Sequence, residues 1–66
     1  MTPKEKAQEL FDKYFDQMLS FGFHLSNRQI SKIAIIAVDE IIEITQHESP
    51  SSWVYYMEVK KELEKL

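Results

Sequence analysis

The 66-residue sequence contains no cysteine, one glycine and two prolines. Without cysteine the chain has no disulfide and no thiolate metal site, which are two common means of stabilising a small domain. A chain of this length buries only about 60% of its unfolded surface, so its own core is marginal. We therefore expect a single domain, residues 1–66, that is completed by homo-oligomerisation.

Other missing features each argue against a class of partner. The sequence has no run of Lys or Arg and its net charge is −3, which argues against nucleic-acid binding. The longest apolar run covers only residues 33–38, whereas about 20 apolar residues are needed to cross a bilayer. The first ten residues, MTPKEKAQEL, contain no apolar signal core. The sequence therefore predicts a cytoplasmic protein with no nucleic-acid and no membrane partner.

The first predicted helix, near residues 3–21, has clear signals at both ends. Thr2 and Glu5 are spaced as a capping box, which typically starts a helix. The only glycine, Gly22, suits a left-handed residue just after the helix end. Between these signals, apolar residues recur at three- and four-residue spacing and form one stripe: Ala7, Leu10, Phe11, Tyr14, Phe15 and Met18.

Two more helices are predicted, near residues 26–46 and 51–65. The second opens on another capping box, made by Ser26 and Gln29. The third follows the polar loop HESPSS and carries an apolar face to the end of the chain. The sequence therefore predicts an all-α fold, a small three-helix bundle.

The second predicted helix is apolar over more of its circumference than one core requires. At 100° per residue, one stripe faces the core and three isoleucines lie outside it. We expect these three, Ile35, Ile36 and Ile42, to lose exposure at a homo-oligomer interface. The alternative is that the helix packs between both neighbours and Ile36 is merely exposed. The expected core stripe is Ile30, Ile33, Ala34, Ala37, Val38, Ile41 and Ile44.

The sequence contains no enzyme signature. The serines near His24 have no glycine elbow or oxyanion loop beside them. Asp39 and Glu40 point about 100° apart on a helix, so they do not converge on a substrate. Two isolated histidines, His24 and His47, do not make a metal site. We therefore expect a non-enzymatic protein with no cofactor and no metal.

One group of residues on the third predicted helix suits a small ligand. Trp53, Tyr56 and Lys60 are spaced by three, four and seven residues, so they share a helix face. Aromatic rings stack on planar groups, and Lys60 suits a phosphate, with Arg28 of the second helix completing the site. The alternative is that Lys60 only packs its stem and extends its ammonium group into water.

Three stretches, KEKAQELFDKYF, AIIAVDEII and EVKKELEKL, together resemble a family of short uncharacterised proteins of tailed bacteriophages. That family ends in W-x-E-V-K-x-E-I-E-K-L, and Tyr56 occupies the tryptophan position here. Small accessory phage proteins of this type often act against host defences. The resemblance therefore implies a counter-defence protein in the host cytoplasm, and it brings no catalytic residue with it.

Two functions are consistent with these features. The first is a binder that sequesters a nucleotide-like immune signal within a homo-oligomer, through Arg28, Trp53, Tyr56 and Lys60. The alternative is a protein–protein interaction module that inhibits a host protein or serves as a phage accessory or structural factor. The predicted partners are a second copy of the chain and either a nucleotide-like small molecule or a host protein.

Overall fold

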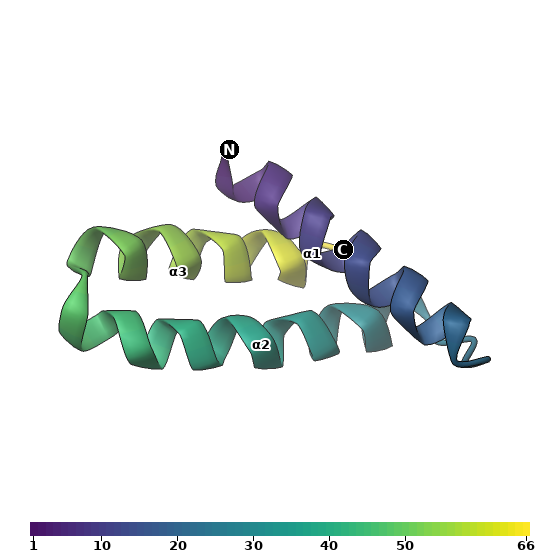
Figure 1. Ribbon diagram of the computed structural model, residues 1–66. Coiled ribbons are helices and arrows are strands. Elements are labelled where there is room, and N and C mark those ends of the chain that lie inside the picture. The colour runs from purple at the N-terminus through teal and green to yellow at the C-terminus, as the bar shows by residue number, and fades with distance from the viewer.

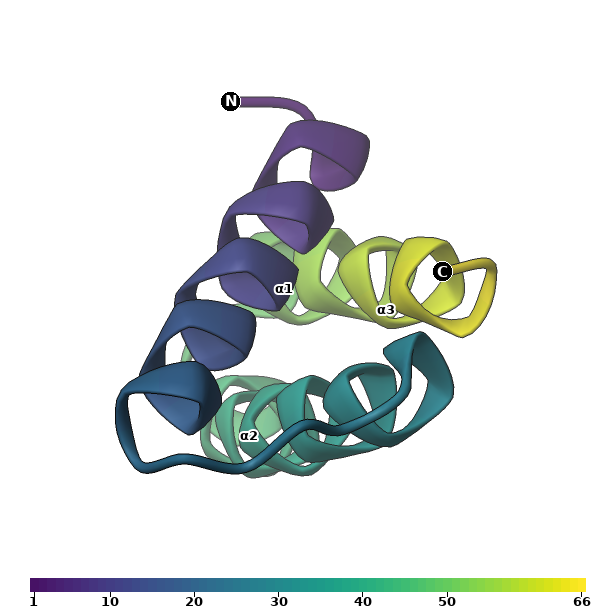
Figure 2. The ribbon, with the colours of Figure 1, turned by 90° about the vertical axis from the view of Figure 1, so that its right-hand side faces the viewer.

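The computed structural model describes residues 1–66 and contains three helices and no strand. Helix α1 spans Pro3–Ser20, α2 spans Asn27–Glu48 and α3 spans Pro50–Glu64. Helices α2 and α3 run antiparallel as a hairpin, and α1 crosses one face of this hairpin obliquely (Figure 1, Figure 2). The predicted all-α fold is confirmed, and every helix end lies within two residues of its expected position.

Both predicted capping boxes form. The N–H of Glu5 donates to Oγ1 of Thr2 over 3.2 Å, and the N–H of Thr2 donates to Oε1 of Glu5 over 2.9 Å. The same reciprocal pair joins Ser26 and Gln29 at the start of α2, with distances of 2.9 and 3.2 Å. Each box satisfies two N–H groups that a helix start would otherwise leave unpaired, which explains why α1 and α2 begin where they do.

Helix α1 ends in a Schellman turn, as the single glycine predicts. The N–H of Phe23 donates to the carbonyl of Met18, and the N–H of Gly22 donates to the carbonyl of Leu19, both over 2.9 Å. Gly22 has a φ of 86°, a left-handed conformation that glycine adopts without the strain of a Cβ atom. This turn directs the chain away from α1 and toward the start of α2.

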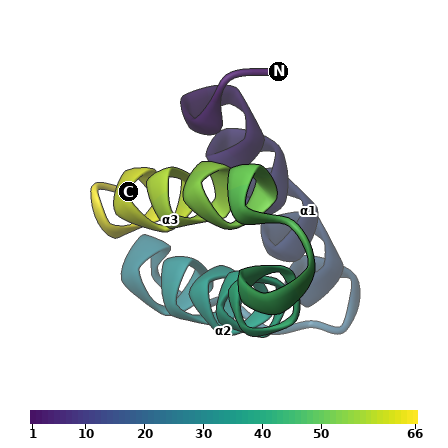
Figure 3. The same cartoon turned by 90° about the vertical axis from the view of Figure 1, so that its left-hand side faces the viewer.

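A single residue, Ser49, connects α2 to α3. Its N–H donates to the carbonyl of Thr45 over 2.8 Å, and Pro50 takes the first position of α3. Proline disfavours helical backbone angles in the residue before it, and Ser49 is extended at φ −149° and ψ 90°. The chain therefore reverses direction at this point, and α3 returns alongside α2 (Figure 3).

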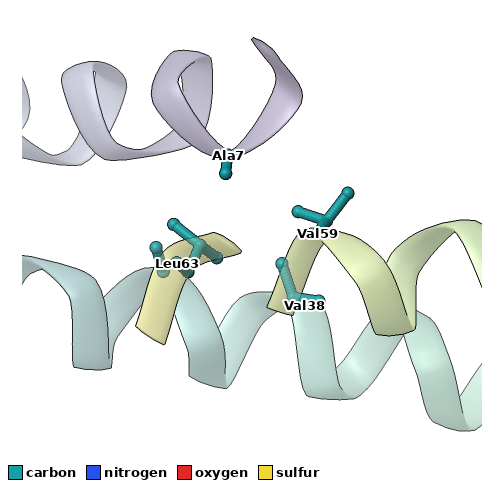
Figure 4. Close-up of a cluster of buried hydrophobic side chains, with 5 residues drawn as sticks. Ala7, Val38, Val59 and Leu63 are labelled. Atoms are coloured by element: carbon teal, nitrogen blue, oxygen red, sulfur yellow. The ribbon is translucent and has the colours of Figure 1, made fainter. Parts of the chain in front are cut away.

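The core lies where the three helices meet, and it is small. Ala7 of α1 points toward the hairpin, where Val38 of α2 lies beside Val59 and Leu63 of α3 (Figure 4). Tyr55 donates its hydroxyl to the carbonyl of Met1 over 3.0 Å, which ties the start of the chain to α3. The fully buried apolar residues are Ala7, Ile30, Ala34, Val38, Val59 and Leu63.

Helix α1 leaves the end of the hairpin next to Ser49 uncovered (Figure 1, Figure 3). Ile44, which was expected in the core, is 59% exposed. This expectation is wrong because α1 crosses the hairpin at an angle and does not extend over that part of α2. None of the three helices combines the length and the apolar character needed to cross a membrane.

Candidate functional site

Lys60, the predicted phosphate ligand, forms an ion pair across the hairpin. Its Nζ lies 2.9 Å from Oδ1 of Asp39 on α2, and both side chains are partly exposed. A pair in this setting contributes about 0–1 kcal/mol, so it is weak enough to break. Asp39 nevertheless places a negative charge where an anionic ligand of Lys60 would have to bind. Within one chain, Lys60 is therefore not a free phosphate-binding group.

The two aromatic residues of the predicted site lie at different depths. Tyr56 packs against the core and meets Tyr55 edge to face, with ring centroids 5.2 Å apart and planes at 89°. Trp53 is 36% exposed. The three hollows of the surface are lined by other residues. Trp53, Tyr56 and Lys60 thus share a helix, but they do not enclose a ligand-sized space.

Arg28, the fourth predicted ligand residue, lies toward the other end of the hairpin. It belongs to the first turn of α2, and about 16 Å of helix separates it from Asp39 at 1.5 Å per residue. It lines a hollow of about 430 Å³ together with Lys65 and Leu66, which follow the end of α3. The structure therefore separates Arg28 from Lys60, and a site made of all four residues would need more than one chain.

The structure also divides the three isoleucines that were predicted at a subunit interface. Ile35 and Ile42 are half-buried and pack against the core, whereas Ile36 is 65% exposed. The expectation that all three fit the core poorly is wrong for Ile35 and Ile42. Helix α3 packs along that flank of α2 while α1 packs along the other, so α2 buries two flanks instead of one. Of these three isoleucines, only Ile36 has a side chain that is open to another molecule.

The side of the hairpin opposite α1 combines apolar and charged groups. On α2, Ile30 marks the side that faces α1, because it borders the same hollow as side chains of α1. Around the axis of α2, Asp39 lies about 180° from Ile30 and Ile36 lies about 120° from it. On α3, Tyr55 contacts the start of the chain, and the exposed Trp53 and Met57 each lie about 160° from it around the helix axis. We name this side the uncovered face (Figure 3), and its residues are Ile36, Asp39, Trp53, Met57 and Lys60.

The turn between α1 and α2 carries an apolar hollow that sequence reasoning missed. The hollow has a volume of about 380 Å³ and is lined mainly by hydrophobic residues, among them Phe15, Leu19 and Phe23. Phe21, in the same turn, is 63% exposed. The signal in the sequence was the apolar stretch around Gly22, FGFHL, because turns are usually made of polar residues.

Comparison with known proteins places the chain in no family. No protein-family model, no curated protein and no solved structure matches it. The resemblance to bacteriophage proteins therefore stays a prediction that rests on three short stretches. No group of three or more His, Asp or Glu side chains comes together as the ligands of a metal ion would.

Proposed function

We propose that the protein is a non-enzymatic interaction module that binds protein surfaces, and that its first partner is a second copy of itself. The distribution of apolar residues supports this proposal. Six apolar residues are buried, whereas eleven large hydrophobic side chains are at least 36% exposed. Exposed apolar patches are typical of protein interaction sites, and their burial would add the stabilisation that so small a core lacks.

The chain exposes enough surface to form a contact with another subunit. The chain exposes 4690 Å², slightly more than the roughly 4400 Å² expected for a compact monomer of its mass. It is also elongated, with extents of 38 × 19 × 17 Å. An interface of standard size, about 800 Å² per partner, would cover roughly one sixth of this surface. The long side of the hairpin offers the room for such a contact.

The charges around Ile36 favour a second copy as the occupant of the uncovered face. Lys32 lies one turn before Ile36 and Glu40 one turn after it, and neither has an ion-pair partner within its own chain. In an antiparallel pair of α2 helices related by a two-fold axis at Ile36, Lys32 lies level with Glu40 of the partner subunit. A parallel pair would instead place lysine beside lysine. The pattern is therefore self-complementary in the antiparallel arrangement.

Replacing Ile36 with glutamate tests this interface. The wild-type protein should have about twice its 7.9 kDa subunit mass in light scattering after size-exclusion chromatography at micromolar concentration. Ile36→Glu should give a monomer, because two carboxylates would meet at the two-fold axis. Ile44→Glu is the matched control, since Ile44 is 59% exposed on the same helix but lies about 80° away. A monomeric wild-type protein, or a dimer that survives Ile36→Glu, would refute the proposal.

A charge exchange tests the antiparallel orientation within the same assay. Lys32→Glu should weaken the dimer by about 2- to 30-fold, since two exposed ion pairs of about 0.2–1 kcal/mol each are lost. The double variant Lys32→Glu with Glu40→Lys restores both pairs with their charges reversed, so it should recover most of the affinity. If the double variant is as weak as the single one, the helices do not pair in this orientation.

Two other predicted functions, sequestration of a nucleotide-like signal and inhibition of a host protein, stay predictions. Sequestration of a nucleotide-like signal through Lys60 requires Asp39 to release the ammonium group, and it requires Arg28 to come from another subunit. A host or phage protein as the target follows only from the resemblance.

A further inference from the structure

Of the three hollows on the surface, only the one at the turn between α1 and α2 is lined mainly by hydrophobic residues. Its volume of about 380 Å³ lies within the range of about 300–1,000 Å³ that is typical of small-molecule sites. Three of its lining residues, Phe15, Leu19 and Phe23, are at least 36% exposed. Apolar surface is therefore open to a ligand here, and none of these residues belongs to the uncovered face.

The aromatic residues in the lining suit a positively charged ligand. Phe15 and Phe23 both belong to the lining, and Phe15 stacks on Phe11 with ring centroids 6.3 Å apart. The face of an aromatic ring carries partial negative charge, so it attracts an ammonium group that lies within about 6 Å. His24 and Ser26 are the only polar residues of the lining, which contains no Lys or Arg. No lysine or arginine in the lining would therefore repel a cation.

Two carboxylates of α1 lie next to the residues that line the hollow. Asp12 lies three residues before Phe15, and Asp16 lies three residues before Leu19. Residues at this spacing are neighbours on a helix surface, with Cβ atoms about 5–6 Å apart. Neither carboxylate has a Lys, Arg or His side chain within 4.0 Å, and Asp12 accepts a hydrogen bond from the neutral amide of Gln8 over 2.9 Å. No ion pair within the chain therefore neutralises these two negative charges.

The nearest basic residues face away from the hollow. On α2, Arg28 and Lys32 each lie about 160° around the helix axis from Ile30, which borders the hollow. On α1, Lys13 lies about 120° from Leu19. The charged groups beside the hollow are therefore acidic, and they complement a cation.

We propose that this hollow binds a small organic cation with an apolar body, such as an arylalkylammonium ion. The apolar body packs against Phe15, Leu19 and Phe23, where it covers exposed apolar surface. The ammonium group lies toward Asp12 and Asp16, so the carboxylates select the sign of the ligand's charge. All of these residues belong to one chain, so the site does not depend on the pairing of subunits.

Three probes that share a phenethyl group test the proposal: phenethylammonium, 2-phenylethanol and 3-phenylpropanoate. They are titrated at pH 7.5 and constant ionic strength, where an alkylamine is protonated and a carboxyl group is ionised. Amide chemical shifts in NMR should show saturable binding at Phe15, Leu19 and Phe23. The affinity should fall from the cation to the alcohol and from the alcohol to the anion. Shifts that do not saturate, or equal affinity for the three probes, would refute the proposal.

Dilution of the protein without any probe tests whether a second copy fills the hollow instead. The amides of Phe15, Leu19 and Phe23 should not shift as the protein is diluted. Dissociation of the dimer proposed above would shift amides near Ile36, so the two proposals can fail separately. Shifts on dilution at the hollow itself would show that another copy occupies it, and the small-cation site would then be wrong.

Paired substitutions separate local attraction from the net charge of the chain. Asp12→Asn with Asp16→Asn should weaken phenethylammonium binding by about 2- to 30-fold, as two exposed ion pairs are lost, and leave 2-phenylethanol binding unchanged. Glu43→Gln with Glu48→Gln changes the net charge equally, but at about 20 and 27 Å along α2 from Ile30, and should change neither affinity. Circular dichroism checks that each variant keeps its fold. The proposal is overturned if the glutamate pair weakens phenethylammonium binding as much as the aspartate pair.

Discussion

Replacing Leu63 with alanine removes one of the largest fully buried side chains of the protein. Leu63 has no exposed surface and belongs to the cluster formed with Ala7, Ala34, Val38 and Val59 (Figure 4). Two of these neighbours are alanines, whose side chains are too short to move into the vacated space. The substitution is therefore expected to leave a cavity that the surrounding helices cannot close.

The size of the effect follows from this poor ability to relax. Leu→Ala substitutions in cores cost about 2–5 kcal/mol, and a site that cannot collapse lies in the upper part of that range, about 3–5 kcal/mol. At about 0.05–0.15 kcal/mol per residue, a chain of 66 residues has a total stability of about 3–10 kcal/mol. Leu63→Ala therefore removes at least roughly a third of the stability. A loss of this size lowers Tm by at least about 12 °C.

Thermal unfolding followed by far-ultraviolet circular dichroism measures this loss. All samples need one protein concentration, because the Tm of an associating protein depends on concentration. Leu19→Ala is the control, since Leu19 is 42% exposed on α1 and its truncation should lower Tm by less than about 4 °C. A Leu63→Ala variant that unfolds within about 4 °C of the wild type would show that the cluster of three helices is not what holds the fold.

Two further substitutions test the helix ends. Gly22→Ala should destabilise the protein by about 1–2 kcal/mol. The cause is left-handed backbone strain alone, because an added Cβ meets nothing within 4 Å. An unchanged Tm would contradict the φ of 86° at this residue. The pKa of Glu5 lies below its ordinary value of 4.5, first because the N–H of Thr2 donates a hydrogen bond to the carboxylate and second because the Thr2 hydroxyl does. The ionised Glu5 therefore stabilises the fold above pH 4.5, and this stabilisation is lost as the pH falls through the lowered pKa. The Tm difference between wild type and Glu5→Gln should therefore shrink below that pH, and a constant difference would show that the charge of Glu5 adds nothing to the cap, because a glutamine makes the same bond at the start of α2.

The helices could be predicted from the sequence because their signals are local. Thr2 with Glu5 and Ser26 with Gln29 need only a spacing of three residues to form a cap, and the structure contains both caps. Gly22 likewise ends α1 through bonds within one turn of the chain. Such features depend on neighbouring residues and not on how the helices pack, so a sequence shows them directly.

The faces of the helices could not be predicted as well, because they depend on packing angles. The helical wheel gave α2 one buried stripe, whereas its two neighbours cover two flanks and bury Ile35 and Ile42 in part. The oblique path of α1, which exposes Ile44, has no signature in the spacing of apolar residues. The register of the hairpin, which the sequence does not show, pairs Lys60 with Asp39. The same register places Arg28 beside Lys65.

The short connections of the fold also determine how it should assemble. Helix α3 follows α2 after a single residue, so the hairpin closes with almost no loss of loop entropy. Helical proteins dominated by such local contacts fold within microseconds to milliseconds. The docking of α1 on α3 is the only packing between helices that are not consecutive. The hydrogen bond from Tyr55 to Met1, which joins residues 54 positions apart, is therefore expected to be among the last contacts to form as the chain folds.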